Sequence, residues 1–165
     1  MNDVFLSLGS NMGDRGANLQ KALADLERWD VRVLRSSSIY VTEPYGRKDQ
    51  QDYYNMVAKV STKRSPEELL MVLHAIERSL GRKRDHARES EKFGPRPIDL
   101  DILFYGDKVL NHPELTIPHP HLAERKFVLV PLCEIAPEFV HPILQKTVEQ
   151  LLMECRDEGR VKPIS

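Results

Sequence analysis

The segment that most restricts how this chain can fold is an apolar run interrupted by two aspartates, Ile98-Asp99-Leu100-Asp101-Ile102-Leu103-Phe104-Tyr105. Successive side chains of a β-strand point to opposite faces, so Asp99 and Asp101 share one face of the predicted strand. The opposite face is apolar and carries Ile98, Leu100, Ile102 and Phe104. Neighbouring carboxylates are destabilising unless a cation, an arginine or water offsets their charge. The run therefore predicts a strand with one buried face and one acidic face.

The segments before this strand alternate between strand and helix patterns. An apolar run from Val4 to Leu8 predicts a first strand, which Gly9-Ser10-Asn11 ends. Helical spacing follows at Leu19, Ala22, Leu23 and Leu26. Period-two alternation then predicts two antiparallel strands, one through Val31, Val33, Ile39 and Val41 and one through Met56, Ala58 and Val60. A second helix is predicted after the capping signal Ser65-Pro66-Glu67-Glu68, with Gly81 at its end.

Charged residues dominate the stretch from Arg82 to Pro97, between the second helix and the acidic strand. A connection of this length in a compact domain is typical of a lid or clamp, and we expect it to order over the site when ligands bind. Beyond the strand, Gly106-Asp107 predicts a hairpin turn into Val109 and Leu110.

Two helices are predicted near the C-terminus, from His121 to Val130 with a start at Pro120, and from Thr147 to Cys155. The whole order of elements indicates an α+β fold, a ferredoxin-like βαββαβ sandwich with an added hairpin and C-terminal helices. We expect one domain over residues 1–165, because a chain of 165 residues that is 41% hydrophobic can bury one core.

The charge balance excludes some classes of partner. With 24 Lys and Arg against 25 Asp and Glu, no net positive field favours nucleic acid or an anionic membrane. No secretory signal or membrane-length apolar segment is evident. Cys133 and Cys155 lack disulfide-framework or metal-ligand spacing, so we expect a reduced, cytoplasmic protein.

The paired carboxylates suggest a magnesium site, because this ion prefers oxygen ligands and commonly takes one or two carboxylates plus substrate phosphates. The alternative is that the acidic face is merely solvated. Arg96 lies just upstream and favours phosphate binding, as do Arg82 and Arg84 in the charged stretch, although a mixed charge run is also typical of a surface loop.

Three other patterns have competing interpretations. Tyr53, Tyr54 and Asn55 offer ring faces and an amide to a flat heterocycle, but they are also ordinary residues at a strand start. His119 and His121 lack a third ligand at zinc spacing. The Gly9-Ser10-Asn11-Met12-Gly13 segment lacks the Lys-Ser/Thr of a P-loop, which favours a tight strand-to-helix turn.

Taken together, these segments resemble the 6-hydroxymethyl-7,8-dihydropterin pyrophosphokinase family over nearly the whole chain. The most specific piece runs from Phe93 through Gly94-Pro95-Arg96-Pro97 to Leu103. Supporting motifs follow in the expected order: Leu8-Gly9-Ser10-Asn11, Ser37-Ser38-Ile39-Tyr40, Asp49-Gln50 to Tyr53 and Asn55, Ile76-Glu77 with Gly81-Arg82, and Leu115 to Pro120.

The resemblance implies an ATP-dependent diphosphotransferase in folate biosynthesis, which transfers pyrophosphate from ATP to the pterin hydroxymethyl group and releases AMP. It implies two Mg²⁺ ions on Asp99 and Asp101. It also implies triphosphate contacts from Arg82, Arg84, Arg96 and Arg125, and a nucleotide side lined by Glu77, Thr116 and His119. Pterin contacts are implied for Thr42, Pro44, Tyr45, Tyr53, Asn55 and Phe127. We expect a monomer that binds small molecules, with neither nucleic acid nor membrane as a partner.

Two other functions could use parts of this pattern. A two-metal nuclease could use Asp99 and Asp101, but it would recruit further carboxylates and a basic track. A ferredoxin-like RNA-binding module would expose aromatic residues in its central strands. The near-neutral charge and the missing aromatic signature argue against both.

Overall fold

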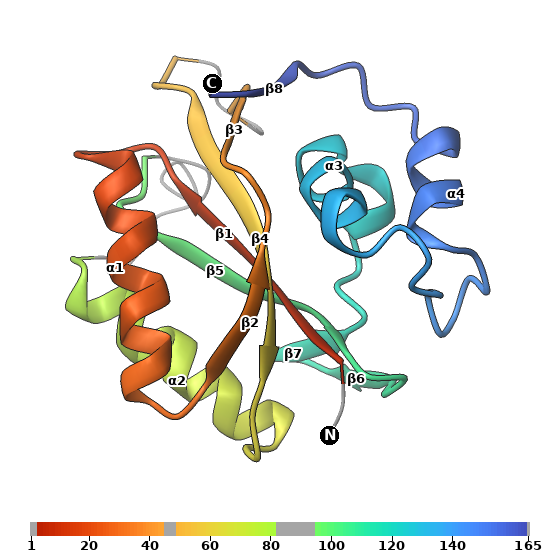
Figure 1. The fold of residues 1–165 in the computed structure, drawn as a ribbon, viewed down its shortest axis with the longest axis horizontal. Coiled ribbons are helices and arrows are strands. Elements are labelled where there is room, and N and C mark those ends of the chain that lie inside the picture. The colour runs from red at the N-terminus through yellow and green to blue at the C-terminus, as the bar shows by residue number, and fades with distance from the viewer. Residues whose placement is uncertain (1–2, 45–48, 82–94, 165) are drawn as a thin grey trace.

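The computed structural model describes residues 3–44, 49–81 and 95–164. Its centre is an antiparallel sheet in the order β5-β1-β4-β3-β8, with β2 pairing β4 beside β3 (Figure 1). The strands are β1 (Val4–Ser10), β2 (Arg32–Ser36), β3 (Tyr40–Thr42), β4 (Tyr53–Ser61), β5 (Asp99–Tyr105) and β8 (Val161–Pro163). Without β8, this order is that of a ferredoxin-like βαββαβ unit, which confirms the predicted fold class.

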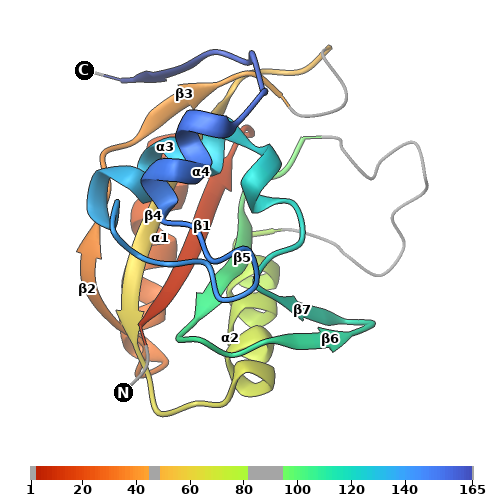
Figure 2. The same cartoon turned by 90° about the vertical axis from the view of Figure 1, so that its right-hand side faces the viewer.

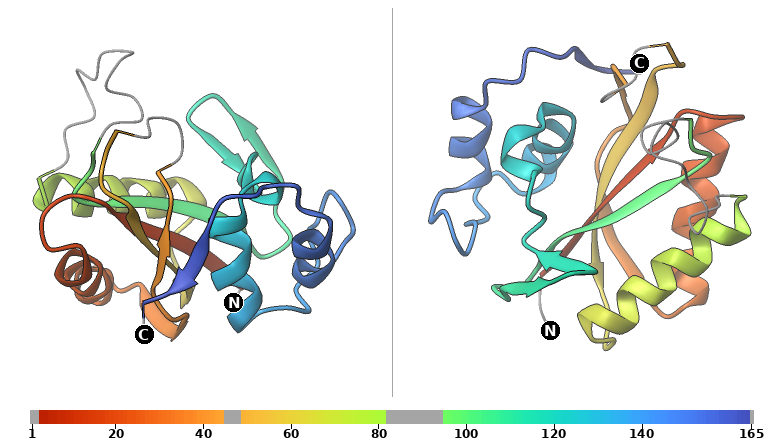
Figure 3. Two further views of the ribbon diagram at one scale, coloured as in Figure 1. Left: turned by 90° about the horizontal axis from the view of Figure 1, so that it is seen from above. Right: turned by 180° about the vertical axis from the view of Figure 1, so that it is seen from behind.

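Helices cover both faces of the sheet, so the molecule has three layers (Figures 1 and 3). Helices α1 (Arg15–Arg28) and α2 (Pro66–Ser79) pack on one face around a core that includes Leu6, Leu19 and Leu73. Helices α3 (Lys126–Ile135) and α4 (Val148–Glu154) enclose a second core with Phe5 and Leu129. In the part of the chain described, no helix is long and apolar enough to span a bilayer.

The helix starts follow their capping signals. Ser65 forms a reciprocal capping box with Glu68 at the start of α2, and Thr147 forms one with Gln150 at the start of α4. Asp14 Oδ1 accepts from Ala17 N at 3.0 Å to cap α1. The predicted end of α2 at Gly81 is also confirmed, because this residue takes a φ of 101° that favours glycine.

The strand expected from Val31 to Val41 is divided into β2 and β3, which pair successively with β4. Ser37 lies at the break, where its hydroxyl accepts from Val57 N at 2.9 Å and its own N–H donates to Val57 O. A shift of register between Val33 and Arg35 precedes it. These local contacts replace regular ladder pairing, so one expected strand becomes two.

Strand β5 confirms the shared face of Asp99 and Asp101 but corrects the placement of Phe104. Leu6 pairs with Ile102 and Phe5 pairs with Phe104, so Leu103 is an extra residue in the ladder. The bulge moves Phe104 to the face covered by α3, where it packs in the second core with Phe5. Strict alternation from the aspartates had predicted the opposite face.

The hairpin after β5 also differs from the prediction. The turn at Gly106 leads to β6 (Leu110–His112), which pairs with β7 (Leu115–Ile117) and not with β5 (Figure 2). The helix predicted from Pro120 is likewise wrong in its start. A 3₁₀ turn, η2 (Leu122–Glu124), comes first, and Arg125 then takes an extended conformation before α3 begins at Lys126.

Candidate active site

Several predicted site residues lie on one face of the sheet, in a single cross-strand row. Gly9 of β1 is paired with Asp99 of β5 on one side and with Asn55 of β4 on the other. Alternation places these positions, with Asp101 and Tyr53, on the face toward α3. Because adjacent strands lie about 4.8 Å apart, Asn55 and Asp99 are separated by roughly 10 Å across Gly9.

Gly9 is the residue that keeps this row open. A Cβ atom at this position would lie 2.5 Å from Asn55 Oδ1 and 3.4 Å from Tyr53 Cδ2. The first distance is far inside van der Waals contact, so the Asn55 amide occupies space that any other residue at position 9 would fill. Glycine is therefore required here by close approach of a neighbouring side chain.

The Asn55 amide is held in a fixed orientation. It is 8% exposed, and its Nδ2 donates to Thr42 Oγ1 at 2.7 Å. Thr42 lies on β3, which pairs with β4, and is itself buried. The structure thus brings together two of the residues for which a pterin contact was predicted, and Tyr53 is directly paired with Thr42.

At the other end of the row, Arg96 stands beside the first aspartate. Its Nη1 lies 3.5 Å from Asp99 Oδ2, and both side chains are about a quarter exposed, at 23% and 26%. The guanidinium offsets part of the negative charge of the two adjacent carboxylates. Cation and carboxylates at one partly open edge form a setting that suits phosphate and a divalent metal.

Asn11, interpreted from the sequence as part of a tight turn, connects both ends of the site. Its Oδ1 accepts from Arg96 N at 2.8 Å, and its own N–H donates to Arg96 O at 3.1 Å. Its Nδ2 donates to Gln50 Oε1 and to Gln51 O. This buried side chain therefore ties the segment before β5 to the segment before β4, which no local sequence signal could reveal.

Arg15, the first residue of α1, supports the start of β4. Its Nη1 donates to Asp52 O at 2.8 Å, and its guanidinium lies 4.0 Å from the centroid of the Tyr54 ring. The segment that leads into Tyr53 and Asn55 is thus held from the α1 side. Tyr54, grouped with Tyr53 in the sequence, faces this arginine across the sheet from Asn55.

Glu77 reaches the acidic strand from the opposite layer. It is fully buried on α2, and its Oε2 accepts from Leu100 N at 2.9 Å. Leu100 lies between Asp99 and Asp101, so this bond holds the backbone that carries both carboxylates. A nucleotide contact by Glu77 stays a prediction, whereas its contact with the strand is direct.

His119 is buried enough to be neutral near pH 7. Burial is the largest cause that lowers its pKa, the charges of Arg125 and His121 lower the pKa as well, Asp99 opposes them, and together they bring it to about 4. His119 Nδ1 accepts from His121 N at 3.1 Å, so the neutral ring carries its proton on Nε2. The side chain therefore offers one N–H donor in the electrostatic neighbourhood of Asp99.

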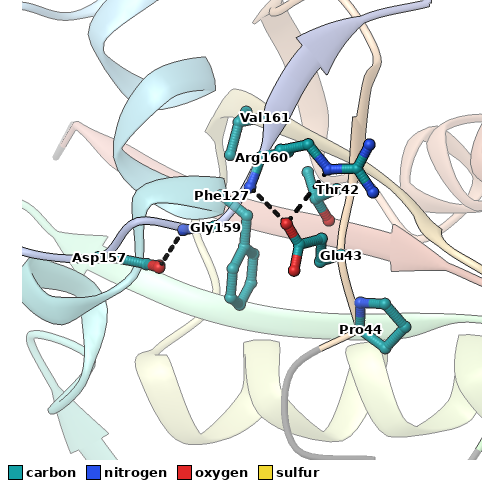
Figure 4. Close-up of a pocket in the computed structure, with 8 residues that line it drawn as sticks. All are labelled: Thr42, Glu43, Pro44, Phe127, Asp157, Gly159, Arg160 and Val161. Atoms are coloured by element: carbon teal, nitrogen blue, oxygen red, sulfur yellow. Dashed lines mark hydrogen bonds and ion pairs between the residues drawn. The ribbon is translucent and has the colours of Figure 1, made fainter. Parts of the chain in front are cut away.

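A pocket open to solvent lies beside the Thr42 end of the row and has an empty volume of about 280 Å³. Thr42, Glu43 and Pro44 form one wall, and Phe127 at the start of α3 forms another (Figure 4). The remaining wall comes from the C-terminal segment, through Asp157, Gly159, Arg160 and Val161. No pattern in the sequence points to this last group, because β8 is only three residues long and its partner strand is distant in the chain.

Other predicted site residues are less directly connected. Arg125 lies 5.8 Å from the Phe127 ring centroid, near the nucleotide side proposed for His119. Thr116 lies on the β6–β7 hairpin, where its hydroxyl donates to His112 O at 3.4 Å. Tyr45, Arg82 and Arg84 lie outside the described residues, as does most of the stretch expected to act as a lid.

The carboxylates of this face can be judged as ligands of a magnesium ion by the oxygen donors that they offer. Among residues 3–44, 49–81 and 95–164, no three His, Cys, Asp or Glu side chains gather as a potential metal site. Mg²⁺ does not need such a cluster, since one or two carboxylates suffice when phosphates and water supply the other ligands. Asp99 and Asp101, both partly exposed on one face, fit this requirement.

Comparison with known proteins agrees with the resemblance in the sequence. The profile of the family described as 7,8-dihydro-6-hydroxymethylpterin-pyrophosphokinase matches residues 5–137. The chain is 46% identical over 163 residues to a Synechocystis 2-amino-4-hydroxy-6-hydroxymethyldihydropteridine pyrophosphokinase. The aligned region covers 97% of this chain and 80% of that protein. The chain is also 41% identical to the Pneumocystis carinii folic acid synthesis protein fol1, but spans only 21% of its length.

Solved structures agree on the fold. Wild-type Plasmodium falciparum HPPK-DHPS with pteroate superposes with a TM-score of 0.72 over 93% of this chain and 42% of that one, at 17% identity. At this identity the likeness supports the fold alone.

Proposed function

The chain belongs to the 7,8-dihydro-6-hydroxymethylpterin-pyrophosphokinase family, and we propose that it transfers pyrophosphate from ATP to 6-hydroxymethyl-7,8-dihydropterin in folate biosynthesis. The hydroxymethyl oxygen would attack the β-phosphorus of ATP. The bond from that phosphorus to the oxygen bridging to the α-phosphorus would break, so AMP would leave. The hydroxyl proton would pass to water.

The observation that best supports this proposal is the Asn55–Gly9–Asp99 row. It places an amide suited to a heterocycle edge and a carboxylate pair suited to metal-bound phosphate on one face of the sheet, two strands apart. This separation suits a bicyclic ring at Asn55 whose hydroxymethyl arm points toward Asp99. Such an arrangement converts the reaction of two bound substrates into one between positioned groups.

On the pterin side, we assign recognition to Asn55 and Thr42 and ring contacts to Tyr53 and Phe127. The Thr42 bond fixes the Asn55 amide before the ligand arrives, which reduces the ordering cost of binding. Pro44 lines the same pocket. Tyr45 is assigned to this side from the family resemblance.

On the phosphate side, Asp99 and Asp101 would hold two Mg²⁺ ions, which would neutralise phosphate charge and orient the β-phosphorus. Arg96, already at this edge, would contact the triphosphate, together with Arg82, Arg84 and Arg125. His119 would donate its Nε2 proton to the nucleotide. Thr116 and Glu77 complete the assigned nucleotide side, with Glu77 acting through the β5 backbone. We further propose a cytoplasmic monomer.

The test is AMP release from ATP and Mg²⁺ with the pterin supplied or omitted. We expect release only when the pterin is present, and we expect Asp99→Asn and Asp101→Asn to lower kcat at least about 100-fold, because each removes one charged ligand of the phosphate-bound metal. Asp107→Asn is the matched control, since this aspartate lies just beyond the same strand and is exposed.

Release of AMP at equal rates without the pterin would indicate a hydrolase and would overturn the proposal. Near-normal turnover by either strand variant would remove its carboxylate from the site.

A further inference from the structure

We propose that the C-terminal segment from Asp157 to Arg160 holds the two walls of the pterin pocket at their working separation, so that Asp157 and Arg160 are positioning residues for pterin binding. The inference rests on the proposed function, because it assigns this pocket to the pterin. It adds a part of the molecule that lies beyond the family match at residues 5–137.

The first contact joins this segment to the Phe127 wall. Asp157 Oδ2 accepts from Lys126 N at 3.0 Å, and Lys126 is the first residue of α3. The residue before it, Arg125, gives α3 no side-chain cap, so a carboxylate 31 positions along the chain satisfies this helix end. An anion at a helix N-terminus is favourable, and here it also fixes the helix turn that carries Phe127.

The second contact joins the same segment to the Thr42 wall. Glu43 Oε1 accepts from Arg160 N at 3.0 Å and from Arg160 Nε at 3.3 Å (Figure 4). The backbone and the side chain of Arg160 therefore both donate to the same carboxylate oxygen. Glu43 lies between Thr42 and Pro44, both of which line the pocket. The position of Arg160 is therefore coupled to the wall that the pterin would contact.

Only a few residues separate the two contacts, so the segment from Asp157 to Arg160 acts as a short spacer between the two walls of the pocket. Asp157 Oδ1 accepts from Gly159 N at 2.8 Å, and this bond tightens the turn between Asp157 and Arg160. Immediately afterwards β8 pairs with β3, with Val161 opposite Thr42. The segment is thus anchored on α3 at one end and on the sheet at the other, with the pocket between them.

The contribution of the Arg160–Glu43 contact to global stability is small enough to separate from its effect on binding. The Arg160 side chain is 69% exposed and that of Glu43 is 32% exposed, and exposed ion pairs contribute little to folding. The walls themselves are held in the fold by α3 packing and by the β3–β4 ladder. Loss of the Arg160 side chain should therefore change the pocket without unfolding the protein.

The experiment compares the Asp157→Ala variant, the Arg160→Ala variant and the double variant with the unsubstituted protein. We expect the KM for the pterin to rise about 5- to 20-fold in the double variant, while kcat and the KM for ATP change less than about threefold, because the loss falls on the geometry of one subsite. Asp157→Asn should restore part of the loss in the Asp157→Ala protein, since its single amide oxygen can still accept from Lys126 N, whereas its Nδ2 cannot accept from Gly159 N. Pterin binding without ATP, followed by the fluorescence of the pterin, should weaken in parallel.

Lys146→Ala is the matched control. This change breaks the exposed ion pair between Lys146 Nζ and Glu154 Oε1, which are 2.9 Å apart in the same C-terminal region. Neither residue lines the pocket. The pterin KM of this variant should equal that of the unchanged protein. If the double variant folds poorly, the Arg160→Ala variant alone still tests the inference, because the Arg160 side chain is exposed and its loss should not unfold the protein.

An unchanged pterin KM in both Arg160→Ala and the double variant, with an active parent protein, would overturn the inference and leave the proposed function intact. Equal rises in both KM values with a fall in kcat would also overturn it, because that pattern indicates general destabilisation. A parent protein that neither binds nor uses the pterin would overturn the proposed function, and the inference with it.

Discussion

Replacement of Gly9 by alanine tests the geometry of the whole site with one methyl group. The new Cβ would lie 2.5 Å from Asn55 Oδ1, whereas ordinary contact begins near 3.4 Å, so the amide must move by about 0.9 Å. That movement breaks or stretches the 2.7 Å bond to Thr42. Overpacking together with the weakened bond should lower the free energy of unfolding by about 1–3 kcal/mol.

The functional effect of Gly9→Ala should fall on the pterin. Because Asn55 moves while Asp99 is left in place, we expect the KM for the pterin to rise about tenfold and the KM for ATP to change less than about threefold. Urea unfolding measures the first effect and steady-state kinetics the second. Gly16→Ala is the matched control: its Cβ would lie 3.9 Å from Asp14 Oδ1, and in a helix the change should be neutral or stabilising by up to about 1 kcal/mol.

A double-mutant cycle decides whether the contact with Asn55 is the cause. In an Asn55→Ala background the blocking oxygen is gone, so adding Gly9→Ala should cost less than about 0.5 kcal/mol. If Gly9→Ala costs as much in that background as in the parent protein, the reasoning from the close approach is refuted.

Two further predictions concern buried polar groups away from the pterin. Glu77→Ala removes the acceptor of Leu100 N and should cost about 1–3 kcal/mol in urea unfolding, while Glu77→Gln, which keeps an acceptor oxygen, should recover most of it; a neutral alanine variant would contradict this. Burial lowers the pKa of His141, whose Nδ1 accepts from Ile143 N and Leu144 N, so the unfolded chain binds the proton more readily. Stability should therefore fall as pH drops below about 6.5, by no more than about 1.4 kcal/mol per pH unit for this proton, and His141→Asn should reduce that slope. An unchanged slope would show that His141 is not responsible.

Local patterns were sufficient for much of the fold. The capping box at Ser65 and the glycine at position 81 marked the two ends of α2 because these signals act within a few residues. Alternation placed Asp99 and Asp101 on one face for the same reason. It failed at Phe104, where a bulge formed against β1 reversed the faces, and at the β5 hairpin, whose strands found partners farther along the chain.

The sequence also predicted the chemical groups of the site. Two aspartates suggest a metal, an arginine suggests phosphate, and an asparagine near aromatic residues suggests a heterocycle. Their relation in space was not predicted. The separation of Asn55 from Asp99 depends on the pairing of three strands through Gly9, and the link from Asn11 to Arg96 joins residues 85 positions apart.

The C-terminal segment shows the same division. Asp157 and Arg160 are ordinary charged residues in a sequence of mixed charge, and no periodicity distinguishes them. Only the tertiary structure sets one carboxylate on the end of α3 and one guanidinium on Glu43, because both partners are brought there by the packing of other elements. The sequence determined which chemistry this protein has available, and the tertiary structure decided which groups meet, since contacts between distant residues depend on the register and packing of the whole sheet.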